Sequence, residues 1–179
     1  MALPAHASTG LLPSESESLA LQTQRILILP TRALDKVRLM QGTFGPFRPA
    51  RTCSVPLWLA LHLKRKRKAR IVCPDWLSVD SLKSSLRHET TSDSFCSLPL
   101  HYPSIARALI DDASDDIPDA SLVRSLLKDL REARQAKIMQ GLSDVNCWHL
   151  EMSNISHSEL CELRPFINRA FDDLKRLLP

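Results

Sequence analysis

The residues that could do chemistry in this 179-residue chain do not fall into the spacings that enzymes use. Its four glycines form neither the phosphate-binding loop G-x-x-x-x-G-K-[ST] nor the dinucleotide fingerprint G-x-G-x-x-G. No G-x-S-x-G segment presents a nucleophilic serine, and no cysteine lies in a known catalytic signature. The sequence therefore predicts a protein that is not an enzyme, with no cofactor and no small-molecule substrate.

The potential metal ligands are also poorly spaced. His88, Cys96 and His101 are separated by eight and five residues, which matches no common zinc pattern. The acidic segment 111–116 resembles part of a calcium loop, but it lacks the turn glycine and has Leu122 where a glutamate is required. We expect no metal, and we interpret the acidic segment as complementing the positive N-terminal end of the helix that follows it.

The composition is that of a soluble intracellular protein. The five cysteines include no C-x-x-C pair, which is typical of a reducing compartment, the nucleus or the cytosol. No window approaches the roughly 18 continuous apolar residues of a membrane span, so we expect no membrane partner. The net charge of +4 is too small to imply a polyanionic partner by itself.

One segment stands out as a candidate binding site, and we call it the basic run. Clustered cations suit a nucleic-acid contact or a nuclear import signal. They also suit a solvated helix end, where cations complement the C-terminal dipole. No aromatic residue is interleaved for base stacking, and we expect the run to face outward with its binding role open. The basic run consists of Lys64, Arg65, Lys66, Arg67, Lys68 and Arg70.

The segments before the basic run are short and rich in turns. Residues 1–18 carry Pro, Ser, Gly and acidic residues with little periodicity and are predicted to be a flexible tail. Residues 25–30 predict a buried strand, residues 37–40 a second strand, and residues 42–49 a loop. Ser54 is placed to cap a helix whose first turn takes Pro56.

The segments after the basic run have helical periodicity. Residues 69–72 predict an extended connection, and Asp75 or Ser78 can cap a helix that runs to about residue 89. Further helices are predicted over 104–112, over 120–140 with Gly141 at the end, and over 158–178. Pro165 either kinks the last helix or moves its start forward. Residues 142–156 are ambiguous between a strand and a helical turn. The last helix is apolar on more than one narrow stripe, which indicates a subunit interface.

The predicted fold class is α+β, mainly α, with a small N-terminal β-rich domain followed by a helical-bundle domain. The expected units are a tail over 1–18, the β-rich domain over 19–72 and the helical domain over 73–179. Several large apolar residues are candidates for packing between units or for contact with a partner. They are Leu57, Trp58, Leu59, Trp76, Leu77, Leu130, Ile167 and Phe171.

Five blocks, in their order and spacing, are similar to one protein family. They include G-P-F at 45–47, V-P-L-W-L-A at 55–60, C-P-D-W-L at 73–77, A-S-D-D-I-P at 113–118 and L-K-D-L-R at 127–131. In these blocks, which lie within residues 19–140, the chain resembles the second "partner of Sld-five" subunits of the eukaryotic GINS complex.

The resemblance implies a β-rich domain and a helical domain in a nuclear heterotetramer with three related subunits. It also implies a non-catalytic role in the replicative helicase, joining the MCM motor to a RecJ-like Cdc protein during initiation and elongation of DNA replication. It further implies that residues 57–59 join the two domains and that residues 74–77 begin the helical one. The alternative is a free-standing nucleic-acid-binding module that uses the basic run.

Overall fold

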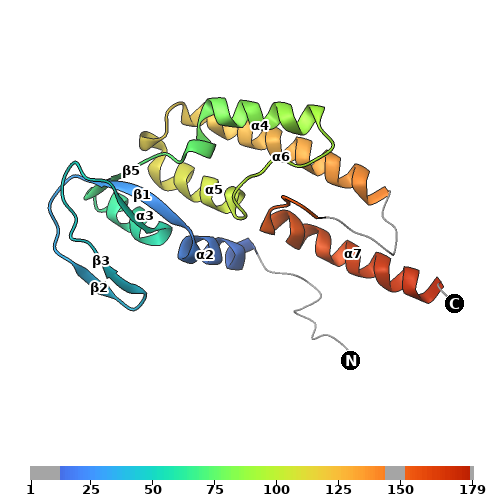
Figure 1. Ribbon diagram of the computed structural model, residues 1–179, viewed down its shortest axis with the longest axis horizontal. Helices are drawn as coiled ribbons and strands as arrows, with labels where there is room; N and C mark the ends of the chain where they lie inside the picture. Colours follow the sequence, from blue (N-terminus) through green and yellow to red (C-terminus); the bar gives the residue numbers. More distant parts are fainter. Residues whose placement is uncertain (1–12, 144–151, 178–179) are drawn as a thin grey trace.

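The computed structural model describes residues 13–143 and 152–177 (Figure 1). Two small sheets lie at one end of the molecule, and four longer helices extend from them toward the C-terminus. This confirms the predicted α+β, mainly helical fold with the sheets first in the chain. No helix in these two ranges is both long enough and apolar enough to span a bilayer.

The main sheet has three antiparallel strands in the order β4-β1-β5. They are β1 (Arg25–Pro30), β4 (Cys53–Pro56) and β5 (Ala69–Ile71). The strand prediction for β1 is confirmed, but the prediction of a buried strand is wrong for one of its faces. Ile26 and Ile28 are buried whereas Arg25 and Leu27 are exposed, because side chains alternate between the two faces of a sheet. The segment expected to be an extended connection is the edge strand β5.

A small hairpin, β2 (Val37–Leu39) and β3 (Gly42–Phe44), follows β1. The predicted loop over 42–49 is therefore wrong for its first three residues, which pair with β2. Gly42 has a φ of 135°, which an L side chain rarely adopts, so the turn uses the conformational freedom of glycine.

Helix α2 (Pro13–Thr23) begins inside the segment predicted to be a flexible tail. That prediction is wrong for residues 13–18, and residues 1–12 lie outside the described part of the chain. The serines and glutamates of 14–18 resemble a solvated tail in composition, but Ala20, on the next turn, is buried in the core. Packing of the turn that contains Ala20 against the core therefore stabilises the helix, despite the polar composition of the residues before it.

Helix α3 (Leu57–Arg65) begins two residues later than the Ser54 cap predicts. Ser54 lies in β4 instead, because Val55 pairs with Ile26 of β1 and holds this segment extended. The helix ends in a tight turn at Arg67, which has a left-handed φ of 55°, and Lys68 N–H donates to the Leu63 carbonyl at 2.9 Å. The basic run is thus a helix end and a reversing turn that leads into β5.

The helical domain starts with a single turn, η1 (Asp75–Leu77), and its predicted order of helices is confirmed. Ser78 caps the next helix by accepting from Ser81 N–H at 3.3 Å. The remaining elements are α4 (Val79–Thr91), α5 (Tyr102–Ala113), η2 (Ser114–Asp116), α6 (Ala120–Ser143) and α7 (His157–Leu177).

Of two predictions about helix ends, the one at Gly141 differs from the structure. Gly141 lies within α6, whose last described turn continues to Ser143, and a Cβ at Gly141 would meet nothing. Pro165 lies inside α7, which begins near its predicted start, so the proline does not move that start forward. Of the ambiguous segment 142–156, residues 144–151 lie outside the described ranges.

A single hydrophobic core joins the sheet to the helices. Helix α3 packs on the inner face of the main sheet and against α5, and α4 lies along α6 (Figure 1). Ile28 of β1, Leu57 of α3 and Leu109 of α5 belong to the same buried cluster. The sheet and the helical domain therefore share a core and hold a fixed orientation to each other.

Candidate functional site

The basic run is not a uniform cationic surface, because its first two residues are bound to the acidic segment. Lys64 Nζ lies 2.7 Å from a carboxylate oxygen of Asp115 and 2.7 Å from one of Asp116. Arg65 donates from two nitrogens to the two carboxylate oxygens of Asp112, at 3.0 and 2.7 Å. We call these five residues the junction clamp, because they tie the end of α3 to the corner between α5 and α6.

Asp116 has a second role in the junction clamp. The same oxygen that contacts Lys64 accepts a hydrogen bond from Ile71 N–H of β5 at 2.8 Å. The prediction that the acidic segment serves the following helix is therefore wrong for its clamp residues. Their carboxylates accept hydrogen bonds from side chains of α3 and from the edge strand β5, 45 or more residues earlier in the chain.

In the junction clamp, the charged forms of both Lys64 and Asp115 are stabilised. A hydrogen bond from Lys64 holds the pKa of the Asp115 carboxyl below its usual value. Burial would lower the pKa of Lys64, but its bonds to Asp115 and Asp116 raise it above the usual value. Both groups are therefore charged at neutral pH, and the contact is an ion pair.

The other four cations of the basic run face solvent, as predicted. Lys66, Arg67, Lys68 and Arg70 are exposed, and in the described ranges none of them is in an ion pair. The outward-facing prediction is wrong for Lys64, whose side chain is only 12% exposed. Arg65 is exposed but has its partner in Asp112.

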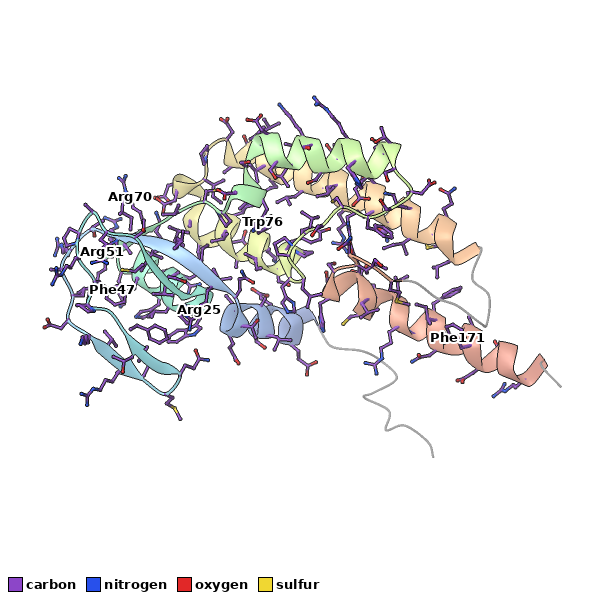
Figure 2. The ribbon with its side chains drawn as sticks, in the orientation of Figure 1. Arg25, Phe47, Arg51, Arg70, Trp76 and Phe171 are labelled. Carbon is purple, nitrogen blue, oxygen red and sulfur yellow. The ribbon has the colours of Figure 1, made fainter. Side chains whose placement is uncertain are left out.

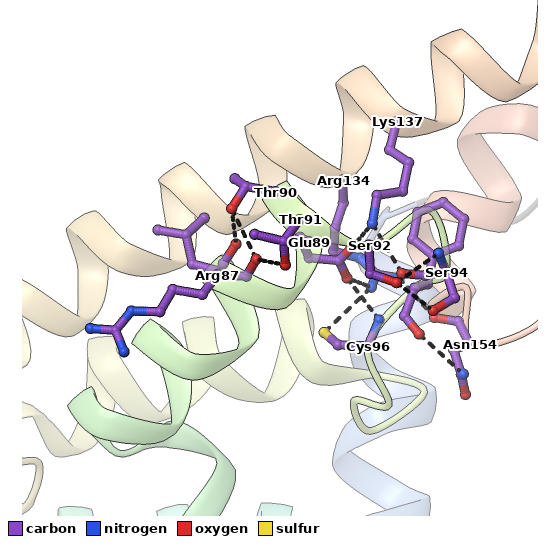
Figure 3. A network of polar contacts seen from close by, with 12 residues as sticks. Arg87, Glu89, Thr90, Thr91, Ser92, Ser94, Cys96, Arg134, Lys137 and Asn154 are labelled. Carbon is purple, nitrogen blue, oxygen red and sulfur yellow. Dashed lines mark hydrogen bonds and ion pairs between the residues drawn. The ribbon is translucent and has the colours of Figure 1, made fainter.

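A second charged cluster, which the sequence reading missed, lies inside the helical domain (Figure 3). The Arg134 side chain is fully buried and donates to both carboxylate oxygens of Glu159, at 2.8 and 2.9 Å. It also donates to Glu89 at 2.6 Å and to the Asn154 carbonyl at 2.8 Å. We call this the Arg134 network; the guanidinium of α6 holds α4, the start of α7 and the segment before it.

Neighbouring groups complete the Arg134 network. Tyr102 of α5 donates to Glu159 at 3.2 Å, Lys137 bonds the second oxygen of Glu89, and the Phe95 ring lies 4.9 Å from the guanidinium carbon. Burial would raise the pKa of Glu89 and of Glu159, but the cations beside them lower both. Both carboxylates are therefore charged in the folded protein.

A local signal for this network exists in the sequence. Arg134 follows Leu130 by four residues and precedes Ile138 by four, and both of those residues are buried. A cation in the middle of an apolar helical stripe must find buried partners, since an unpaired buried charge is very unfavourable. The positions of Glu89 and Glu159 are not readable in this way, because they lie 45 and 25 residues away.

The eight apolar candidates divide into two groups by burial. The buried group consists of Leu57, Leu59, Leu77, Leu130 and Ile167, and the partly exposed group consists of Trp58, Trp76 and Phe171. A buried side chain leaves almost no area for a partner, so any of these residues that contacts a partner belongs to the partly exposed group. The labelled Trp76 and Phe171 lie far apart, at the start of the helical domain and along α7 (Figure 2).

Trp58 contacts the hairpin of its own domain. Its indole N–H donates to the Gln41 side-chain oxygen at 2.9 Å, in the turn between β2 and β3. It therefore attaches the hairpin to α3, while the neighbouring Leu57 is fully buried in the core shared with the helices. Leu57 and Leu59 lie in the core that the two domains share, and Trp58 packs against that core from its edge.

The described residues hold no group of three or more histidine, cysteine or acidic side chains that could bind a metal. A hollow of about 700 Å³ lies between α2, α5, α6 and α7, and Cys161 lines it. Its sulfur lies 3.7 Å from His157 Nδ1, at the ordinary one-turn spacing of a helix.

Comparison with protein families matches two models in succession. The PSF2 N-terminal domain matches residues 12–72, and the GINS complex protein helical bundle domain matches residues 76–177. The chain is 35% identical over 178 residues to the DNA replication complex GINS protein psf2 of Schizosaccharomyces pombe, covering 99% of this chain and 97% of that one.

Similar proteins occur well beyond that yeast. The DNA replication complex GINS protein PSF2 of Homo sapiens is 32% identical over 168 residues, covering 92% of this chain and 90% of its own. The protein of the same name from Saccharomyces cerevisiae is 40% identical over 129 residues, covering 71% and 61%. With both domains matched in order, and with the Schizosaccharomyces pombe and human relatives aligned over 97% and 90% of their length, the chain belongs to the PSF2 family of GINS complex proteins.

Proposed function

We propose that this chain is a non-catalytic structural subunit of a heterotetrameric GINS complex in the nucleus. In this role it binds three related subunits, and through the complex it supports the replicative helicase formed with the MCM motor and a RecJ-like Cdc protein. Its contribution is geometric, because it holds surfaces for several partners in a fixed arrangement. The match of both family models in succession is the observation that carries the proposal.

The fold supports a structural role. The shared core and the junction clamp fix the sheet against the helices, so that partners on the two domains are held at a constant separation. Helix α7 presents Leu160 and Phe166 to solvent, at 40% and 54% exposure. Apolar side chains of this size on an outer helix are typical of a face that a subunit covers.

Co-expression with the three sister subunits, followed by native mass spectrometry, tests the proposal. We expect one complex with one copy of each chain. Leu160→Asp together with Phe166→Asp should remove this chain from the complex, because a buried, unpaired carboxylate is unfavourable in an interface. Met40→Asp is the matched control, since Met40 is fully exposed on the β2–β3 hairpin. A stable monomer that co-purifies with none of the three would overturn the proposal.

The second candidate function is nucleic-acid binding through the exposed part of the basic run. The four exposed cations favour it, whereas the pairing of Lys64 and Arg65 removes a third of the run from such a role. Charge reversal at Lys66, Arg67 and Lys68 should weaken binding to a short DNA duplex and reduce its salt dependence by about 3 in slope. Lys64 and Arg65 are left intact, since changing them would also break the junction clamp.

A further inference from the structure

The outer face of the main sheet carries apolar residues where an exposed face is usually polar. On β1 the outward positions are Arg25, Leu27 and Leu29, and Leu27 is 48% exposed. Val72 N–H donates to the Leu27 carbonyl at 3.0 Å, which places Val72 beside Leu27 just beyond β5, and Val72 is 37% exposed. Antiparallel sheets with one solvated face normally alternate apolar inward and polar outward residues.

The inner face of this sheet already has its covering layer in α3, but no element of the described ranges covers the outer face. A hollow of about 460 Å³ extends from the outer face toward the helical domain. Leu27, Val72 and Pro74 line it, together with the partly exposed Trp76. The apolar surface therefore continues from the sheet across the start of the helical domain. Such a surface is typical of a sheet face that is covered by another layer of secondary structure.

Cations lie at the two ends of this outer face (Figure 2). Arg25 begins β1, and Arg70 of β5 is the cross-strand neighbour of Leu29. Four residues along a strand separate the two ends by about 13 Å. Both arginines are exposed, and in the described ranges neither is in an ion pair. Arg70 is near enough to Asp115 to contribute to its lowered pKa, and Asp75 is the carboxylate that lines the hollow.

We propose that the outer sheet face docks an acidic amphipathic helix of another protein. Its apolar stripe covers Leu27, Leu29 and Val72 and reaches Trp76, and its carboxylates, two turns apart, pair with Arg25 and Arg70. Two helical turns span about 11 Å, which fits the separation of the arginines once side-chain reach is included. A docked strand is disfavoured on the β5 side, because Asp116 already occupies the outward-pointing N–H of Ile71.

A defined peptide tests this with the full-length chain. The probe is a fluorescein-labelled helical peptide of about 18 residues, with a leucine stripe between two glutamates two turns apart. We expect saturable binding in fluorescence anisotropy, and no binding of the same peptide with lysines in place of both glutamates. Leu27→Ser, and separately Arg25→Glu with Arg70→Glu, should each weaken binding about tenfold or more.

The matched control is Arg38→Glu with Arg48→Glu, which changes the net charge equally at two exposed arginines elsewhere and should leave binding unchanged. Equal binding of the glutamate and lysine peptides, or no effect of Leu27→Ser, would overturn the proposal. Equal displacement of the probe by a short single-stranded DNA would also overturn it, in favour of a general polyanion site. The assay contains no sister subunit, so its failure is distinct from a failure of the proposed assembly.

Discussion

The junction clamp and the Arg134 network both hold opposite charges that link distant segments of the described chain, and they differ in their exposure to water. The junction clamp lies partly at the surface: the side chains of Asp115 and Arg65 are 73% and 67% exposed, whereas those of Lys64 and Asp116 are 12% and 9% exposed. The Arg134 network lies in the interior, where the side chains of Arg134 and Glu89 are fully buried. Both clusters tie together elements that are far apart in the sequence.

The difference teaches what each cluster contributes. An exposed ion pair adds little free energy of folding, because water screens the charges and solvates them well when they part. A buried ion pair need not add net stability either, but the loss of one member leaves a desolvated charge without a partner. The exposed contacts of Asp115 and Arg65 should therefore add little, whereas the network makes the position of α7 depend on one guanidinium.

The largest effect is expected for Arg134→Met. This change leaves Glu89 and Glu159 buried beside each other without their shared cation, and should lower the free energy of unfolding by about 3–5 kcal/mol. Urea denaturation followed by circular dichroism measures it. Arg131→Met is the control on the same helix, since Arg131 is exposed and pairs with Glu162 at the surface. A loss for Arg134→Met no greater than for the control would remove the distinction between the clusters.

Acid should act through the network as well. The pKa values of Glu89 and Glu159 are lowered in the folded protein, so their contribution is complete above the usual glutamate pKa of about 4.3 and is lost as the pH falls toward the folded values. The wild type should therefore lose stability below about pH 4.3 more steeply than Glu159→Gln. Thermal denaturation between neutral pH and acid measures the two curves. Parallel curves would contradict this account.

Within the junction clamp, the two carboxylates that share Lys64 should behave differently. Asp116→Ala removes a partner whose side chain is only 9% exposed and leaves Ile71 N–H without its acceptor, which should destabilise the fold by about 1–3 kcal/mol. Asp115→Ala removes an exposed partner of the same lysine, and we expect no resolvable change in Tm. Differential scanning calorimetry measures both variants. An equal loss of stability in the two would show that the contact with Lys64, rather than the hydrogen bond to Ile71 N–H, accounts for the stability that the clamp adds.

The smallest effect concerns the exposed turn of the basic run. Arg67 has a left-handed φ, so Arg67→Gly should relieve backbone strain and raise the free energy of unfolding by about 0.5 kcal/mol, after the entropy lost by glycine is subtracted. Arg67→Lys keeps the strain and should give no gain. Chemical denaturation of both variants measures the difference. A loss of stability in the glycine variant would mean that the Arg67 side chain makes a stabilising contact.

Local patterns predict most of the helical domain from sequence. The spacing of Val123, Leu126 and Leu130 predicts α6, and Ser78 is recognisable as a helix cap because its side chain acts on the following turn. The clamp and the network could not be predicted in the same way. Their contacts join residues 20 to 57 positions apart, and only the fold brings them together.

The errors near the N-terminus have the same origin. Ser54 has the side chain of a cap, but pairing of Val55 with Ile26 holds its segment in the sheet. Residues 14–18 have the composition of a tail, but the helix they begin packs Ala20 into the core. In both places a long-range contact outweighs the local preference.

Asp116 also affects how the chain behaves before it meets a partner. A short edge strand with free N–H groups is a template on which another chain can add a strand and start aggregation. The carboxylate occupies the outward N–H of Ile71 on β5 and places a negative charge beside it. This one residue therefore favours solubility of the newly made chain, and it does so with the same oxygen that orients the two domains.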